Sequence, residues 1–428
     1  MRLNKIDSKD VQALSAYLES REAGVDQQMN AKVLDIIEQV RTRKDDALLE
    51  YTEKFDHVKL DSLIMSEEEI EAVMSKVDAS LIADLKEAAE NIACYHEKQL
   101  QEGYEIQKED GVYLGQRVIP LERVGVYVPG GRAAYPSTVL MNVIPAKIAG
   151  VKEIVMVTPP SADGSVDPVI AAAAHIAGVT RICKVGGAQA VAALAYGTQS
   201  IPRVDKIVGP GNAYVACAKR LVYGKVDIDM IAGPSEILVI ADKGADPEYV
   251  AVDMISQAEH DPMASSILIT DDETLVEKVE EALQRQSDAL PRQEIISQSL
   301  SNYGTVMVCD TIEECIEKAN AIAPEHLELM VQDARSWLPL VRNAGSVFLG
   351  YYTCESIGDY FGGCNHVLPT NGTARFASAL SCDSFIKKSS YLHYTKEALQ
   401  RDGGKIMNIA HHESLDGHAN AVKVRMKP

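Results

Sequence analysis

The spacing of apolar residues divides the chain into a helical start and a longer α/β part. In the first hundred residues, KVLDIIEQV and LIADLKEAAENIACYHEKQL carry apolar positions at heptad-like spacing, which predicts amphipathic helices. From residue 117, short β-branched runs such as RVGVYV alternate with Ala-rich segments such as PVIAAAAHIAG. Because Gly and Pro punctuate these segments, the alternation predicts βαβ units and a mainly parallel sheet.

The same alternation restarts at EILVIAD and continues through SSILITDD and GTVMVCD. The two α/β blocks join near residues 232–235, and no residue-level repeat decides whether they are copies of one fold. We therefore expect an α/β protein with two Rossmann-like parallel-sheet domains in succession. Both domains are incomplete and lack GxGxxG, and small helical elements flank them at the N-terminus and in the C-terminal tail.

The expected domain boundaries follow the changes in this pattern. Residues 1–25 form an N-terminal helical segment, and residues 26–125 with 236–380 form a first, discontinuous α/β domain with a helical start. Residues 126–235 form the second α/β domain. Residues 381–428 form a polar, histidine-rich tail, which must dock on its own subunit or on a partner.

Composition narrows the class of protein. A chain of 428 residues exceeds what one hydrophobic core usually serves, which supports more than one domain. The net charge of -20 argues against a nucleic-acid binder, which normally presents a basic face. The N-terminus lacks the apolar core of a secretory signal, and no apolar run is long enough to span a membrane. We expect a cytoplasmic protein.

The 8 cysteines include no CxxC pair, so a cysteine-based zinc site is not expected. In a cytoplasmic chain they are interpreted as reduced thiols, mostly buried. Cys354 and Cys364 lie beside candidate site residues and are interpreted as bystanders.

Three glycine-rich loops each follow a predicted strand and precede a helix: VPGG at 128–131, VGGAQA at 185–190 and VGPGNAY at 208–214. Such a loop lets the backbone approach a phosphate and directs helix amides at it. None matches GxGxxG or the P-loop, and each alone is as consistent with a tight turn. Three in one block favour a dinucleotide or phosphate ligand.

Several segments carry residues suited to metal binding or proton transfer. Gln257 and His260 lie three apart at a helix end and share a face, as zinc ligands or as a hydrogen-bonding pair. Glu325 and His326 in PEHL offer two proton acceptors of different basicity, or a pair that caps a helix end.

The glycine-rich segment GDYFGGCNH contains Asp359 and His366, and the tail segment HHESLDGH contains Glu413 and His418. The concentration of histidines and carboxylates after residue 325 favours a metal site with nitrogen and oxygen donors. Spacing alone does not choose between a metallohydrolase and a dehydrogenase.

Taken together, the motifs resemble those of the L-histidinol dehydrogenase family from about residue 30 to the tail. They are RVGVYVPGG, STVLMNVIPA, VGGAQA, DKIVGPGNA, AGPSE, SQAEHD, PEHLEL, AGSVFLG, ESIGDY and NHVLPT. The resemblance implies a four-electron oxidation of L-histidinol to L-histidine through L-histidinaldehyde, which uses two NAD molecules and completes histidine biosynthesis. It also implies one zinc ion per subunit and a homodimer that shares its active sites by exchanging tails.

The resemblance also assigns residues. It makes Gln257, His260, Asp359 and His418 the zinc ligands. His326 becomes the general base, and Glu325 activates water on the bound aldehyde. The implied substrate contacts are Ser235, Gln257, His260, His326, Asp359, His366, Glu413 and His418. The implied NAD contacts are Tyr127, Gln189 and Asn212, which lie in or beside the three glycine-rich loops.

Other hypotheses remain at this point. A zinc hydrolase could use the same ligands with Glu325 as water activator, but it leaves the glycine-rich loops unexplained. A relative that oxidises another alcohol, such as a sulfonate alcohol, and a non-catalytic α/β binding protein are further alternatives. The sequence does not decide how Arg132 affects cofactor affinity, which metal is physiological, or how products leave.

Overall fold

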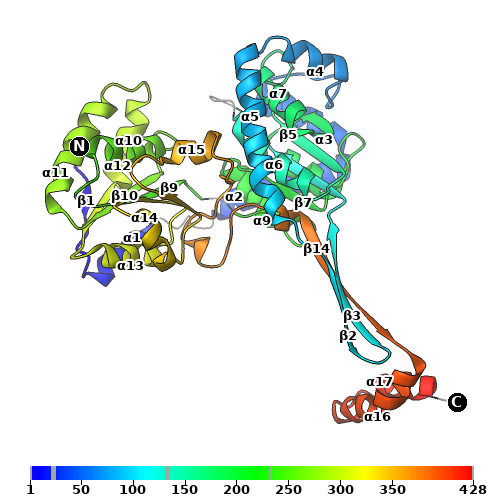
Figure 1. The fold of residues 1–428 in the computed structure, drawn as a ribbon. Coiled ribbons are helices and arrows are strands. Elements are labelled where there is room, and N and C mark those ends of the chain that lie inside the picture. Colours follow the sequence, from blue (N-terminus) through cyan, green and yellow to red (C-terminus); the bar gives the residue numbers. More distant parts are fainter. Residues whose placement is uncertain (1, 21–25, 131–134, 232, 427–428) are drawn as a thin grey trace.

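The computed structural model describes residues 2–20, 26–130, 135–231 and 233–426. Figure 1 shows two α/β bodies side by side and a long arm that carries the C-terminal helices away from both. Within the described residues, no helix combines the length and the apolar character needed to cross a membrane.

The first body is built on a 6-stranded parallel sheet with the order β1-β11-β10-β9-β12-β13. Its strands are β1 (Asn4–Lys5), β9 (Glu236–Ala241), β10 (Ser265–Thr270), β11 (Thr305–Val308), β12 (His326–Met330) and β13 (Ser346–Leu349). Every residue of β9, β10 and β12 is buried because helices cover both faces of the sheet.

Alternate residues of β9 point to opposite faces and define the two layers of helices. Ile237 and Val239 pack with one layer and Leu238 and Ile240 with the other. The first layer consists of α10 (Pro247–Ala258), α11 (Glu273–Ser287) and α12 (Gln293–Tyr303). The second consists of α1 (Val11–Ser20), α13 (Ile312–Ile322) and α14 (Ala334–Trp337).

The second body is built on a 5-stranded parallel sheet with the order β6-β5-β4-β7-β8. Its strands are β4 (Arg123–Tyr127), β5 (Glu153–Thr158), β6 (Arg181–Lys184), β7 (Lys206–Val208) and β8 (Asp227–Ile228). One face is covered by α4 (Glu67–Met74), α5 (Ala79–His96), α6 (Pro136–Ile148) and α7 (Pro168–Ala177). The other is covered by α2 (Gln27–Arg43), α3 (Asp45–Asp56), α8 (Gly187–Tyr196) and α9 (Ala213–Val222).

Both sheets follow the same path. Strands β4, β5 and β6 follow one another from the middle of the sheet to one edge, and β7 and β8 then lie on the other side of β4. The chain repeats this path with β9, β10 and β11, followed by β12 and β13. This is the order of the first five strands of the doubly wound dinucleotide-binding fold, with switch points between β4 and β7 and between β9 and β12. The prediction of two Rossmann-like parallel-sheet blocks is confirmed.

The packing of the helical start differs from the expected domain partition, which placed residues 26–125 with 236–380. Helices α2 and α3 pack on α8 and α9, and α4 and α5 pack on α6 and α7, all on the 5-stranded sheet. The apolar faces of these helices are real, but periodicity does not specify which sheet they cover. Residues 1–25 also differ from an isolated helical segment, because β1 extends the 6-stranded sheet beside β11.

The arm is a 3-stranded antiparallel sheet, β14-β3-β2, capped by two helices (Figure 1). It comprises β2 (Tyr104–Glu109), β3 (Val112–Pro120), β14 (Ile386–Tyr394), α16 (Lys396–His412) and α17 (Asp416–Lys423). The tail, which was expected only as a polar, histidine-rich segment, therefore contains a 9-residue strand. Its residues Ile386–Tyr394 are almost all exposed, so they lack the apolar alternation that marks a half-buried strand.

The remaining described elements are short. They are α15 (Glu355–Tyr360) and the 3-10 turns η1 (Glu97–Gln99), η2 (Leu338–Leu340), η3 (Thr373–Arg375), η4 (Cys382–Phe385) and η5 (Val424–Met426).

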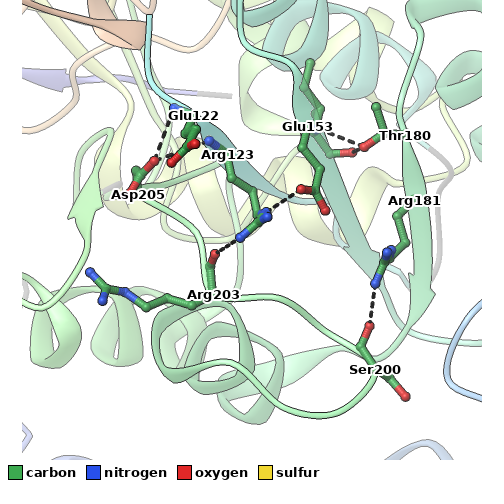
Figure 2. Close-up of polar contacts among 9 residues, drawn as sticks. Glu122, Arg123, Glu153, Thr180, Arg181, Ser200, Arg203 and Asp205 are labelled. Carbon is green, nitrogen blue, oxygen red and sulfur yellow. Dashed lines mark hydrogen bonds and ion pairs between the residues drawn. The ribbon is translucent and has the colours of Figure 1, made fainter.

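Polar contacts anchor the root of the arm, where β3 passes into β4 (Figure 2). The Arg123 side chain donates to the Glu153 carboxylate on β5 at 2.6 Å and to the carbonyl oxygen of Arg203 at 2.9 Å. The Asp205 carboxylate, just before β7, accepts from the backbone N–H groups of Glu122 and Arg123 at 3.2 Å. These contacts tie the amino ends of three neighbouring strands to the base of the arm.

A buried ion pair supports the glycine-rich loop that follows β7. The Lys219 ammonium donates to the Asp229 carboxylate and, at 2.9 Å, to the carbonyl oxygen of Gly209. Asp229 in turn accepts from the N–H of Gly209 at 2.8 Å. The side chains of Lys219 and Asp229 are 4% and 2% exposed. Removing one charge would therefore leave the other buried without a counter-charge.

Replacing Lys219 by Met is expected to lower the free energy of unfolding by about 3–5 kcal/mol, because Asp229 is left buried without its counter-charge. Denaturant-induced unfolding of the two proteins measures this difference. The control is Lys5→Met, which removes an exposed ion pair with Glu273 and should change stability little. Similar small losses in both variants would contradict the structural role of the buried pair.

Candidate active site and cofactor cavity

The candidate acid–base pair lies at the amino end of β12. The side chains of Glu325 and His326 are almost fully buried. His326 Nδ1 lies 2.9 Å from the carbonyl oxygen of Glu236, so we assign the proton to Nδ1, which donates to this oxygen. His326 Nε2 is then the basic nitrogen, and it has no hydrogen-bond partner among the described residues. The arrangement presents a buried imidazole ready to accept a proton.

The Glu325 carboxylate is held by the same neighbouring strand. It accepts a hydrogen bond from the N–H of Glu236 at 2.9 Å. Burial raises the pKa of Glu325 to about 8, although nearby His326 and the bond from Glu236 oppose this shift. A carboxyl group with such a pKa can accept a proton from water at mildly alkaline pH.

Three further side chains gather beside His326 and could hold a cation. His260, Glu355 and Asp359 each offer a ligand atom, and these atoms lie within 4.8 Å of one another. His260 follows α10, whereas Glu355 and Asp359 lie one turn apart on α15. Glu355 is buried beneath the other two, and His260 is exposed. Nitrogen and carboxylate oxygen donors of this kind suit zinc.

Gln257 lies at the end of α10 and is buried against the same group. In the orientation that satisfies its neighbours, its amide nitrogen lies 3.2 Å from the carbonyl oxygen of Glu236, from Glu355 Oε1 and from His326 Nδ1. It donates to the two oxygens, because Nδ1 gives its own proton to Glu236 over the shorter distance of 2.9 Å. Its amide oxygen is therefore the atom left to face a cation. The structure thus brings together Gln257, His260 and Asp359, as the resemblance implied.

Ser235 and His366 complete this side of the site. Ser235 precedes β9 and is half-buried, next to Glu236. His366 Nδ1 lies 3.8 Å from Asp359 Oδ1, and burial lowers the pKa of His366, which favours its neutral form. The segment after α15 also reaches the other body, because the Asn365 side chain donates to the carbonyl oxygen of Met141 on α6 at 2.8 Å. The site therefore lies at the seam between the two bodies.

Glu355 also belongs to this group, although it was not predicted from the sequence. Its carboxylate Oε1 lies 3.6 Å from His326 Nε2, and its N–H donates to Glu328 at 2.8 Å. Burial raises the pKa of both Glu355 and Glu328 well above the usual range. The available signal was its position four residues before Asp359, which places both carboxylates on one helix face.

Two predicted site residues, Glu413 and His418, lie far from the His326 cluster of their own chain. Glu413 follows α16 and His418 lies in α17, both exposed at the tip of the arm and far from α15 (Figure 1). Their own chain therefore does not complete the predicted zinc site.

The predicted cofactor residues surround a cavity of about 1030 Å³ at the carboxyl edge of the 5-stranded sheet. Tyr127 ends β4, Gln189 lies in the first turn of α8, and Asn212 caps α9 by accepting from the N–H groups of Tyr214 and Val215. Tyr127 and Asn212 thus flank the switch point between β4 and β7, where doubly wound sheets bind ligands. The structure brings all three residues to one cavity.

Tyr127 also connects two of the glycine-rich loops. Its hydroxyl accepts from the N–H of Gly187 at 3.0 Å, and burial raises its pKa to about 12. A Cβ atom on Gly209 would lie 2.1 Å from the carbonyl oxygen of Tyr127, and the φ angle of Gly209 is +107°, so only glycine fits there. Gly131 and Arg132 of the first loop lie outside the described residues.

Comparison with known proteins bears on these two sites. The family model for histidinol dehydrogenase matches residues 19–426. The chain belongs to the histidinol dehydrogenase family. The histidinol dehydrogenase of Clostridium acetobutylicum is 52% identical over 427 residues, which cover 100% of this chain and 99% of that protein. The histidinol dehydrogenase of Geobacillus kaustophilus is 53% identical over 406 residues, which cover 95% and 96%.

The fold agrees with a solved member of the family. The crystal structure of histidinol dehydrogenase from Elizabethkingia anophelis has a TM-score of 0.94 at 41% identity and covers 99% of this chain and 98% of that one. The predicted resemblance is therefore confirmed, and with it the class of NAD-dependent oxidoreductase in histidine biosynthesis. A hydrolase or a non-catalytic binding protein is no longer a competitive interpretation. The roles of individual residues remain predictions.

Proposed function

We propose that this chain oxidises L-histidinol to L-histidine through L-histidinaldehyde, in two successive NAD-dependent steps at the amino end of β12. The observation that carries the proposal is the buried Nε2 of His326, which has no hydrogen-bond partner in the described part of the chain and lies beside Gln257, His260 and Asp359. The cavity that contains Tyr127, Gln189 and Asn212 is the proposed NAD site. The overall reaction consumes one water and two NAD and yields two NADH and three protons.

The donor set fits the proposed zinc ion. Gln257, His260 and Asp359 would hold it, and His418 of the partner subunit would complete the protein ligands. When bound, the ion would anchor the imidazole and amino nitrogens of the substrate, which orients the alcohol carbon. Ser235, His366 and Glu413 are the further substrate contacts we propose. The carboxylate of Glu413 suits the positively charged amino group.

In the first oxidation, His326 accepts the hydroxyl proton of histidinol while hydride leaves the alcohol carbon for NAD. The hydrogen bond from Nδ1 to Glu236 holds the tautomer in which Nε2 is basic. Once protonated, Nε2–H has an acceptor nearby in the Glu355 carboxyl group, 3.6 Å away. Glu355 thereby acts as a positioning residue for the base.

In the second oxidation, Glu325 takes a proton from water as the oxygen attacks the aldehyde carbon. His326, which was protonated in the first oxidation, gives its proton to the aldehyde oxygen, so the resulting hydrate has a hydroxyl group in the place of the original alcohol. His326 then accepts its proton while a second hydride leaves for a second NAD. A single base can serve both oxidations because both remove a hydroxyl proton and a hydride from the same carbon.

We also infer that two subunits exchange their tails, so that Glu413 and His418 of one chain reach the site of the other. The arm supports this inference because it extends from its own body and exposes Leu392, Ile409 and Leu415 (Figure 1). Several exposed apolar side chains on one extended arm indicate a surface covered by another molecule. A cytoplasmic location is part of the same proposal.

The purified, zinc-loaded protein given L-histidinol and NAD should form two NADH for each L-histidine. Glu325→Gln should slow oxidation of supplied L-histidinaldehyde by roughly a hundredfold, within the usual range for a general base, and affect alcohol oxidation much less. In the unmodified protein, the rate of aldehyde oxidation should rise as the pH increases through about 8, because Glu325 must lose its proton to act as a base. Absorbance at the NADH band measures both rates.

His326→Asn is the matched variant, and it should impair both oxidations while zinc stays bound. An absence of NADH with the zinc-loaded protein would refute the proposed activity. The division of roles would be refuted if Glu325→Gln lowered the rates of alcohol and aldehyde oxidation equally. It would also be refuted if the rate of aldehyde oxidation depended on pH in the same way in Glu325→Gln and in the unmodified protein.

Tail exchange predicts complementation between two inactive variants. In a heterodimer of His326→Asn and His418→Asn subunits, one site would carry both changes and the other neither, so about half of the activity per dimer should return. Two affinity tags allow this heterodimer to be purified and assayed beside each parent. If every heterodimer is as inactive as its parents, each site is built from a single chain.

A further inference from the structure

Asp56, the last residue of α3, carries a carboxylate oxygen for which the described residues supply no hydrogen-bond partner. Asp56 lines the cofactor cavity, close enough to Tyr127 to influence its hydroxyl group electrostatically. Its Oδ2 is buried and has no hydrogen-bond donor among the described residues. Burying an acceptor without a donor is unfavourable, so such an atom calls for an explanation. A ligand in the cavity that supplies hydroxyl donors would provide one.

The other carboxylates of the cavity differ from Asp56. Asp167 caps α7 and accepts from the N–H groups of Val169 and Ile170, so its oxygen is already used. Asp35 on α2 is exposed to water. Within the described lining of the cavity, Asp56 is thus the carboxylate with a buried oxygen left over for a ligand.

The position of Asp56 relative to the sheet suggests which part of the cofactor it meets. In doubly wound dinucleotide sites, an acidic residue near the second strand binds the hydroxyl groups of the adenosine ribose. Here the second strand is β5, and its end carries Thr158 followed by two prolines, without an acid. The chain after Asp56 runs along β6, where Ile64 bridges to Cys183. Asp56 therefore reaches the adenosine side from an added helix.

We propose that Asp56 accepts hydrogen bonds from the vicinal hydroxyl groups of the adenosine ribose and thereby selects NAD over NADP. This inference rests on the proposed function, because it assumes that the cavity holds the cofactor. The 2′-phosphate of NADP would remove one of these donors and place a phosphate dianion against the carboxylate. The cationic side chains of the described lining, Lys32 and Lys54, are both exposed and therefore well screened.

The test compares Asp56→Asn with the parent protein in the zinc-loaded form at saturating L-histidinol. Loss of the charged acceptor should lower kcat/KM for NAD by roughly tenfold or more, whereas kcat/KM for NADP should stay or rise. The KM for L-histidinol and the zinc content should not change. Glu53→Gln is the control, because Glu53 lies on the same helix, is exposed and does not line the cavity.

Two outcomes would overturn the inference. One is a parent protein that uses NADP as well as NAD. The other is an Asp56→Asn protein that keeps the thermal unfolding midpoint and the NAD-to-NADP ratio of the parent. If Asp56→Asn is unstable, Asp56→Ser gives the same comparison with a smaller side chain. A parent protein that reduces neither cofactor with L-histidinol would instead refute the proposed function.

Discussion

The proposed chemistry depends on the backbone of Glu236, which holds both Glu325 and His326 in place. Its N–H donates to the Glu325 carboxylate and its carbonyl oxygen accepts from His326 Nδ1, both at 2.9 Å. The N–H and C=O of one strand residue lie on the same side of the strand, and those of Glu236 face β12, which pairs with β9 in parallel with His326 opposite Ile237. The relative position of the proposed base and the proposed water activator is therefore set by the pairing of two buried strands.

The two bodies share one strand order but use opposite edges of their sheets. The cofactor cavity lies at the carboxyl edge of the 5-stranded sheet, where the doubly wound rule predicts it. The candidate catalytic groups instead lie at the amino edge of the 6-stranded sheet. At the carboxyl edge of that sheet, beside its switch point, Asp242 accepts from Gln332 N–H and the Tyr351 hydroxyl.

Much of this architecture could be predicted from sequence, and the misses have physical causes. Strand–helix alternation predicted both parallel sheets, and the loops after β4, β6 and β7 predicted the cofactor cavity. The sheet on which α2 to α5 pack was not predictable, because the spacing of apolar residues shows that a helix has a buried face but not which sheet that face contacts. Glu355 was missed because a buried carboxylate in a short helix is indistinguishable from a solvated one. Spacing left Gln257 as either a zinc ligand or a hydrogen-bonding partner, and the family resemblance chose the ligand role; the structure places Gln257 beside Glu355.

The central claim is that side chains far apart in the sequence converge on one zinc ion across two chains. A crystal structure of the zinc-loaded protein with L-histidinol, with diffraction recorded on both sides of the zinc absorption edge, tests it most directly. The account predicts one anomalous peak per subunit, bonded to Gln257, His260, Asp359 and His418 of the partner subunit. A zinc ion held by other residues, or no peak near His326, would contradict it.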